Sequence, residues 1–240
     1  VGQIAAALIV MKGGFRKIPA LVVFPHQIKR IYKLGIPNIL MQAAYTFYIF
    51  GLNLILATFS DQAVTVLGLY YKWQAFFFIP LGAMQTCIVP VVSYNYAAGK
   101  YERCKKTLMV AIIFGIALMM IGVVLFETIP GPMLHVFSHD PKVISIGEVA
   151  FRFIGISFIP LVSSLTFPVF FQALGHAVKS SILTIIRTVF LFIPLAYLFS
   201  RFGLNYFWLT FPVTDSITTL AGYLFYRQFV KKTMPKTIME

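Results

Sequence analysis

Charged residues are scarce in this chain, and acidic residues are the scarcest. Of 240 residues, 11% are charged, 59% are hydrophobic and seven in total are Asp or Glu. A soluble globular domain carries about 25% charged residues and less than half apolar ones. The composition therefore excludes an ordinary water-soluble enzyme and indicates that lipid is the solvent for most of the chain.

Cysteine is nearly absent as well. Cys87 lies in a hydrophobic run and Cys104 in a basic segment, which fits neither a disulfide framework nor a metal pair. The net charge of +13 comes from short basic segments between long uncharged runs, without the interleaved aromatic residues of a nucleic-acid-binding patch. Nucleic acid is therefore not expected as a partner, and the basic segments are interpreted as a signal of membrane topology.

Motifs of catalysis are missing too. The chain contains no Gly-rich phosphate loop, nucleophile elbow or metalloprotease motif. His135 and His139 are four residues apart, but they lie in a Gly- and Pro-containing loop without a clear third ligand. The four histidines are expected at both membrane surfaces, which argues against a membrane-embedded enzyme. We expect no enzyme activity, no metal site and no cofactor.

Long uncharged runs are what the chain does have. Four of them contain no Asp, Glu, Lys or Arg: 34–60, 73–99, 107–126 and 153–178. About 20 apolar residues in a helix cross the ~30 Å hydrocarbon core, so each run predicts a transmembrane helix, the second beginning near residue 63. The stretch 180–226 predicts two more spans joined near 201–205. The predicted fold is an all-α, six-helix transmembrane bundle.

The bundle is expected over residues 34–232, with other segments at its ends. Residues 1–11 are uncharged but would span only about 17 Å as a helix, so they are predicted to be the end of a truncated transmembrane helix. Residues 12–33 form either a basic cytoplasmic linker or an amphipathic helix at the membrane surface. Residues 233–240 are expected to be a cytoplasmic tail.

The basic residues also predict orientation. Fifteen Lys and Arg fall in the segments on one side of the predicted bundle, against Lys142 and Arg201 on the other. Because Lys and Arg are enriched in cytoplasmic loops, both ends of the six-helix unit are expected in the cytoplasm. The chain is thus predicted to be a multi-pass protein of the cytoplasmic membrane.

Three charged residues fall near the predicted centre of the bilayer: Lys72, Arg187 and Asp215. An isolated charge there costs about 2.5–3.5 kcal/mol, so each should face the bundle interior or water. We expect Asp215 to pair with Arg187 or Lys72 on a cavity wall, which makes all three candidates for transport or ion coupling. A purely structural ion pair fits the sequence equally well.

Uncharged polar residues recur at helical spacing on the predicted spans, and aromatic residues accompany them. They predict either a substrate cavity or interhelical hydrogen bonds. The candidate cavity residues are Gln42, Tyr45, Thr46, Asn53, Gln74 and Gln85.

One part of the chain is more specific than its composition: residues 67–74 (LGLYYKWQ), 78–82 (FIPLG) and 89–100 (VPVVSYNYAAGK). These stretches resemble the eighth helix, and the loop after it, of the multidrug and toxin extrusion (MATE) family of bacterial efflux transporters. The segment Gln172-Ala173-Leu174-Gly175 is similar to the end of its tenth helix. Arg187 with Pro194, and the segment 211–215 (FPVTD), resemble its eleventh and twelfth helices.

The resemblance implies a twelve-helix transporter of which this chain is the carboxy-terminal half. The implied activity is export of cationic or amphipathic compounds by alternating access, in exchange for H⁺ or Na⁺. The implied partners are the lipid bilayer, such substrates and a missing amino-terminal six-helix bundle, without which the chain is not expected to transport. Residues 34–60 lack the acidic cation ligand of many members. A flippase for a lipid-linked saccharide, or a non-transporting membrane partner subunit, remains the alternative.

Overall fold

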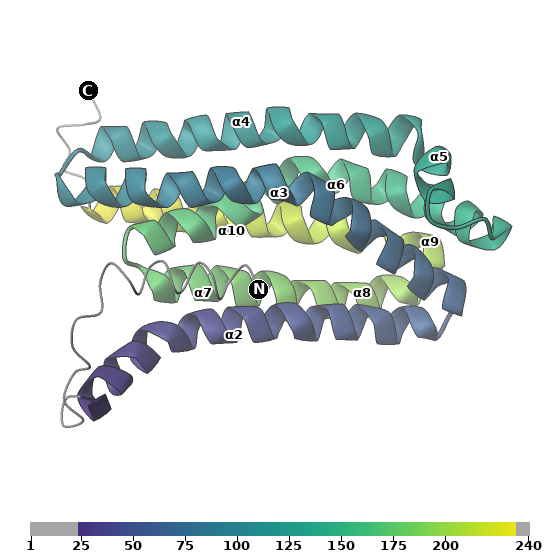
Figure 1. Cartoon of the computed structure of the whole chain (residues 1–240), viewed down its shortest axis with the longest axis horizontal. Coiled ribbons are helices and arrows are strands. Elements are labelled where there is room, and N and C mark those ends of the chain that lie inside the picture. Colours follow the sequence, from purple (N-terminus) through teal and green to yellow (C-terminus); the bar gives the residue numbers. More distant parts are fainter. Residues whose placement is uncertain (1–23, 234–240) are drawn as a thin grey trace, which may run out of the picture. The chain divides into compact units, whose positions relative to one another are not determined.

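The computed structural model describes residues 24–233, and every secondary-structure element within that range is helical (Figure 1). The elements in chain order are α2 (Phe24–Ala57), α3 (Asp61–Ala97), α4 (Tyr101–Thr128), α5 (Pro130–His135), α6 (Pro141–Ala173), α7 (Ala177–Ile185), the π-helix η2 (Ile186–Phe192), α8 (Ile193–Ser200), α9 (Leu204–Phe207) and α10 (Thr210–Thr233).

The contacts divide the chain into two units, residues 1–39 and 40–240. The arrangement below concerns the second unit. The predicted end of a truncated helix, 1–11, and most of the predicted tail lie outside the described residues. Helix α2 begins at Phe24, so residues 24–33 of the predicted linker or interfacial helix are helical and continue into the first candidate span, Ile39–Ala57.

The all-α membrane fold is confirmed. Five helical segments are long and apolar enough to cross a membrane: Ile39–Ala57, Asp61–Ala97, Tyr101–Thr128, Pro141–Ala173 and Ala177–Ser200. The sixth long helix, α10, carries Asp215 within a threonine-rich sequence and is less apolar than the others. Its polar residues are accounted for by its position against α6, described next.

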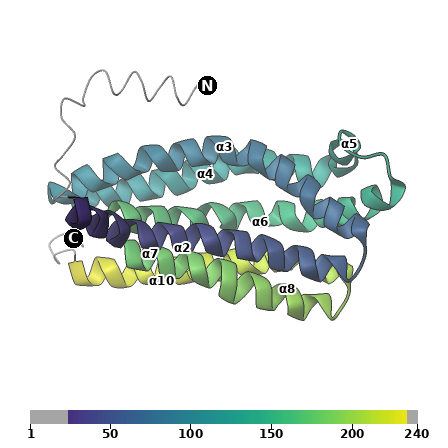
Figure 2. The same ribbon diagram turned by 60° about the horizontal axis from the view of Figure 1, so that its bottom comes forward.

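The centre of the unit is α6, which packs against α10, α4, α3 and α7. In its most apolar stretch 67% of the residues are buried, compared with 22–28% for the other four candidate spans. Figure 2 shows α3 and α4 side by side on one side of α6, with α7 and α10 on the other. Helix α6 is thus the most buried of the five candidate spans, although some of its side chains, such as Ile156, remain exposed.

Capping residues define where the helices begin. The Ser60 hydroxyl accepts a hydrogen bond from the Ala63 backbone N–H at the start of α3. At the start of α6, Asp140 accepts one from the Lys142 N–H, with Pro141 in the first turn. Such caps satisfy backbone donors that have no partner inside the helix.

Two helices end in the same way. Gly99 follows α3 with φ +70° and Gly175 follows α6 with φ +78°, a conformation that favours glycine. The next residue then donates its N–H back to the last turn, Lys100 to the Asn95 carbonyl and His176 to the Phe171 carbonyl. This is the Schellman geometry.

Both turns lie at one end of the unit, which we call the basic end. The Phe229 ring on α10 lies there, 6.2 Å from Tyr96 on α3 and 5.2 Å from His176. The basic residues of this end that the structure describes include Lys100, Arg103, Lys105, Lys106, Lys179, Arg227 and Lys231. The opposite end holds α5 and α9.

Close approach of α10 to α6 depends on Gly222. A Cβ at this position would lie 2.5 Å from Phe167 Cδ2 and 3.0 Å from Phe167 Cβ. At Gly68 on the exposed face of α3, a Cβ would meet no atom within 4 Å. The same substitution should therefore have opposite effects at the two sites.

We predict that Gly222→Ala lowers the free energy of unfolding by about 1–3 kcal/mol, because α10 must move away from Phe167. Gly68→Ala, the matched control, should be neutral or stabilising by up to about 1 kcal/mol, because alanine favours the helix. Thermal unfolding in detergent measures both variants. Equal unfolding temperatures for the two variants would contradict the packing argument.

Candidate functional site

A cavity of about 200 Å³ opens between α2, α3, α6, α7 and η2. Its walls combine aromatic, apolar and uncharged polar side chains. The lining residues are Met41, Tyr45, Tyr48, Gln74, Phe78, Gln85, Ser164, Leu165, Pro168, Val169, Gln172, Ser180, Thr184, Arg187 and Thr188. Arg187 is the one charged residue among them.

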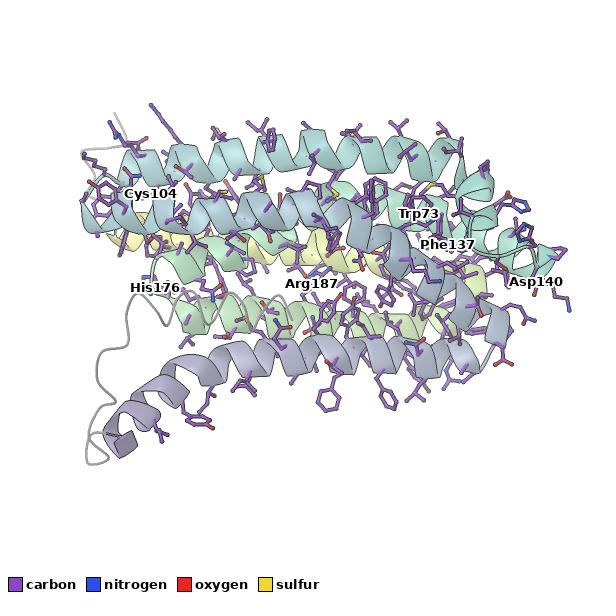
Figure 3. All side chains as sticks on the ribbon, viewed as in Figure 1. Trp73, Cys104, Phe137, Asp140, His176 and Arg187 are labelled. Carbon is purple, nitrogen blue, oxygen red and sulfur yellow. The ribbon has the colours of Figure 1, made fainter. Side chains whose placement is uncertain are left out.

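Arg187 is held by a buried carboxylate. Its Nε lies 2.7 Å from Asp215 Oδ1, and the two residues are 7% and 1% exposed. Asp215 does not line the cavity itself, so it acts on the cavity through Arg187. The predicted pairing of these two residues is confirmed, and Figure 3 shows Arg187 near the middle of the helices' length.

A serine on α6 completes the ion pair. The Ser164 hydroxyl lies 3.0 Å from Asp215 Oδ1 and 2.9 Å from the Leu161 carbonyl oxygen. Residues of η2, α10 and α6 therefore meet at one carboxylate. Removing either charged partner would leave an uncompensated charge in an apolar interior, which is far more costly than the loss of a surface ion pair.

The π-helix η2 determines where Arg187 points. Pro194 follows it and has no N–H to donate to the preceding turn, so the helix widens before the proline. Arg187 and Phe192 lie at the two ends of this widened segment, with the guanidinium carbon 5.0 Å from the Phe192 ring centre. Such local widening is frequent at functional sites.

Aromatic rings form the wall beside the ion pair. The Phe192 ring lies 5.0 Å from Tyr48 on α2 and 5.3 Å from Phe211 on α10, which in turn lies 5.3 Å from Tyr70 on α3. The Tyr71 hydroxyl donates to the Tyr48 hydroxyl at 3.4 Å. These rings connect four helices around the cavity.

Three of the predicted cavity residues line this cavity, namely Tyr45, Gln74 and Gln85. Gln74 is 6% exposed, and the Gln85 side-chain nitrogen is buried without a hydrogen-bond partner in the part of the chain that the structure describes. A buried amide nitrogen without a partner is costly and is available to a ligand that offers an acceptor.

The other predicted cavity residues lie elsewhere on α2. Gln42 and Thr46 are exposed, and the Thr46 hydroxyl donates to the Gln42 backbone carbonyl. The Asn53 amide donates to the Ile49 carbonyl of its own helix at 2.8 Å. The structure does not bring these three residues to the cavity.

Of the two partners predicted for Asp215, the structure pairs it with Arg187 and not with Lys72. Lys72 is exposed, and its Nζ lies 4.7 Å from the centre of the Phe137 ring, in the connection between α5 and α6. The neighbouring Trp73 Nε1 donates to the Met133 carbonyl of α5. Figure 3 shows Trp73 and Phe137 nearer the opposite end of the unit than Arg187. Lys72 lies with them through its contact with Phe137.

Helix α3 has 37 residues, which is about 55 Å and much longer than the ~30 Å hydrocarbon core. The position of Lys72 along α3 therefore does not by itself give its depth in the membrane, and that depth stays a prediction.

Some cavity residues were not predicted from the sequence. Ser180, Thr184 and Thr188 line it from α7 and η2, and Gln172 and Ser164 line it from α6. The first three are spaced four residues apart, which is the signal that could have found them. Ser164 and Gln172 carry no such signal.

Within residues 24–233, no group of three or more His, Cys, Asp or Glu side chains is placed to hold a metal ion. The His135 and His139 rings lie 6.0 Å apart at the opposite end of the unit.

The fold is similar to that of solved membrane transporters. A structure described as the outward-facing conformation of a multidrug resistance MATE family transporter of the MOP superfamily matches with a TM-score of 0.81 at 20% identity, over 91% of this chain and 49% of that one. A MOP superfamily transporter from Pyrococcus furiosus matches with a TM-score of 0.79 at 22% identity, over 90% and 49%.

The family to which the chain belongs is identified by a match to a family model. The MatE model matches residues 37–198, more than half of the chain, so the chain belongs to the MatE family. The resemblance seen in the sequence is thereby confirmed, and the family is one of transporters rather than enzymes.

The curated relatives carry two kinds of names. The multidrug export protein MepA of Staphylococcus haemolyticus is 24% identical over 177 residues, which are 74% of this chain and 39% of the relative. An FAD transporter of Shewanella oneidensis is 24% identical over 170 residues, 70% of this chain and 38% of the relative. The chain thus spans less than half the length of these relatives.

We predict that Ser164→Ala destabilises the protein by about 1–3 kcal/mol, because Asp215 loses a hydrogen bond in a buried site. The adjacent Ser163→Ala is the matched control, since no hydrogen bond of the Ser163 hydroxyl is found among the described residues. Thermal unfolding compares the two variants. A loss of the same size at Ser163 would show that Asp215 does not depend on Ser164.

Proposed function

We propose that this chain is one lobe of a cation-coupled multidrug efflux transporter of the cytoplasmic membrane. It works with a second six-helix lobe, and the substrate site alternates between the two membrane faces as the lobes move. Both ends of the six-helix unit lie in the cytoplasm, in keeping with the Lys and Arg at the basic end.

The observation that carries the proposal is the Arg187–Asp215 pair at the wall of an amphipathic cavity. Tyr45, Tyr48 and Phe78 offer aromatic faces, and Gln74 and Gln85 offer amides. Flat compounds with apolar rings and a few polar groups suit such walls. The single cation of the wall is already neutralised by Asp215.

The neutralisation of Arg187 by Asp215 also distinguishes anionic from cationic substrates. FAD carries phosphate groups, and an anion of that kind needs cations that are available to it. In the described part of this cavity the one guanidinium is bound to a carboxylate, which supports amphipathic or cationic compounds as substrates.

The ion pair also supplies a mechanism for exchange. When Asp215 is ionised, it cancels the charge of Arg187 and a cationic substrate can occupy the cavity. When Asp215 takes up a proton, Arg187 faces the cavity with an uncompensated positive charge and repels the substrate. Proton and substrate binding are then linked, and each weakens the other by the same factor.

We predict that Asp215→Asn abolishes proton-driven efflux while folded protein remains in the membrane. In the wild type, acidification should weaken ethidium binding by about 5- to 150-fold, the usual range of coupling between two sites. In Asp215→Asn this pH dependence should disappear, because no proton can be exchanged. Fluorescence titration of ethidium on the purified complete transporter, with both lobes, measures the effect.

Asp61→Asn, the same substitution at an exposed acid in the first turn of α3, is the control and should keep the pH dependence. Efflux from vesicles with either a proton or a sodium gradient identifies the coupling ion. Normal proton-driven transport by Asp215→Asn would disprove the proposed role of the pair. Transport of FAD or of a lipid-linked saccharide, without any effect on drugs, would disprove the substrate class.

A further inference from the structure

A second cavity lies on a different face of α3, between α3 and α4 in the half of the unit near the basic end. Its volume is about 380 Å³, larger than that of the central cavity. The lining residues are Met84, Cys87, Ile88 and Val91 of α3 with Lys106, Thr107, Val110, Ala111 and Phe114 of α4. We call it the α3–α4 groove.

The groove has a polar mouth and an apolar length. Because α3 and α4 run antiparallel, Lys106 faces Val91 at the basic end, and Phe114 faces Met84 at the inner end. Eight residues of helix separate Lys106 from Phe114, which is about 12 Å. Beyond Lys106 and Thr107, every lining side chain is apolar or a thiol.

Lys106 differs from Lys105 and Lys179, two other lysines of the basic end. Lys105 lies 3.6 Å from Glu102, and Lys179 lies over the rings of Phe171 and Phe229. Lys106 is exposed and has neither an ion-pair nor an aromatic partner among the residues the structure describes.

The mouth of the groove lies at the level expected for the membrane interface. Tyr94 is 72% exposed near the end of α3, and the rings of Tyr96 and Tyr101 lie 5.7 Å apart across the turn to α4. Exposed tyrosines gather where headgroups meet the hydrocarbon. Lys106 follows Tyr101 by five residues, so its long side chain reaches this level.

We propose that the α3–α4 groove binds an anionic phospholipid, with an acyl chain along Val91, Val110 and Phe114 and the phosphate on Lys106. Basic pockets between transmembrane helices are known sites for anionic headgroups. An apolar channel with a cation at one end matches the two parts of such a lipid. The site is separate from the central cavity and does not depend on the transport activity.

The chain offers a matched comparison on the other face of α4. A smaller groove of about 180 Å³ is lined by Lys105, Leu108, Met109 and Phe167 together with Tyr223 and Tyr226. Its lysine is paired with Glu102. Lys105 directly precedes Lys106 on α4. Its replacement therefore removes one positive charge from the same helix without removing the proposed phosphate contact.

The test measures lipid retention by native mass spectrometry of the purified complete transporter. The protein is titrated with phosphatidylglycerol or phosphatidylcholine of identical acyl chains. We expect a preference of about fivefold for phosphatidylglycerol, the size expected for one lysine at a membrane surface. Lys106→Gln should remove the preference, Lys106→Arg should keep it, and Lys105→Gln should leave it unchanged.

Val91→Phe fills the groove and should lower the retention of both lipids, while thermal unfolding confirms that each variant is folded. Equal loss of preference in Lys105→Gln and Lys106→Gln would show diffuse surface attraction and overturn the proposal. Unchanged retention in Val91→Phe would overturn it as well. Retention of neither lipid by the wild type would overturn the proposal too.

Discussion

A guanidinium and a carboxylate in contact inside an apolar bundle constrain the helices around them. Either charge alone in this interior would cost several kcal/mol, so η2, α6 and α10 must meet at one depth. The 2.7 Å contact between Arg187 and Asp215 and the Ser164 hydroxyl satisfy that requirement. The widened turn before Pro194 and the rings around Phe192 can be understood as the geometry that keeps this contact closed.

The remaining architecture follows from the position of α6. Because α6 packs against α3, α4, α7 and α10, these neighbours each have one face toward it and another toward lipid or a cavity. The central cavity and the α3–α4 groove lie on different faces of α3. Helix α3 thus separates the central cavity, whose walls are of mixed polarity, from the α3–α4 groove, which is almost wholly apolar.

The sequence predicted the helices and the deep ion pair because both depend on strong free-energy terms. Uncharged runs must cross lipid, and Asp215 must find a cation. It left Lys72 and Arg187 as alternative partners of Asp215, because the spacing of charges along a sequence does not show which helices meet. It proposed Gln42, Thr46 and Asn53 for the cavity because helical spacing gives a shared face but not the direction of that face. Ser164 and Gln172 depend on packing between helices, which has no local signal.

The limited apolarity of α10 has a consequence for biogenesis. On the insertion scale an aspartate at the centre of a helix opposes entry into the bilayer by about 2.5–3.5 kcal/mol. Asp215 carries that cost into the last long helix, whereas its partner Arg187 is synthesised earlier, on η2. Insertion of α10 into the bilayer is therefore coupled to assembly of the bundle, because the cost of Asp215 is offset only when α10 packs against helices that are already inserted.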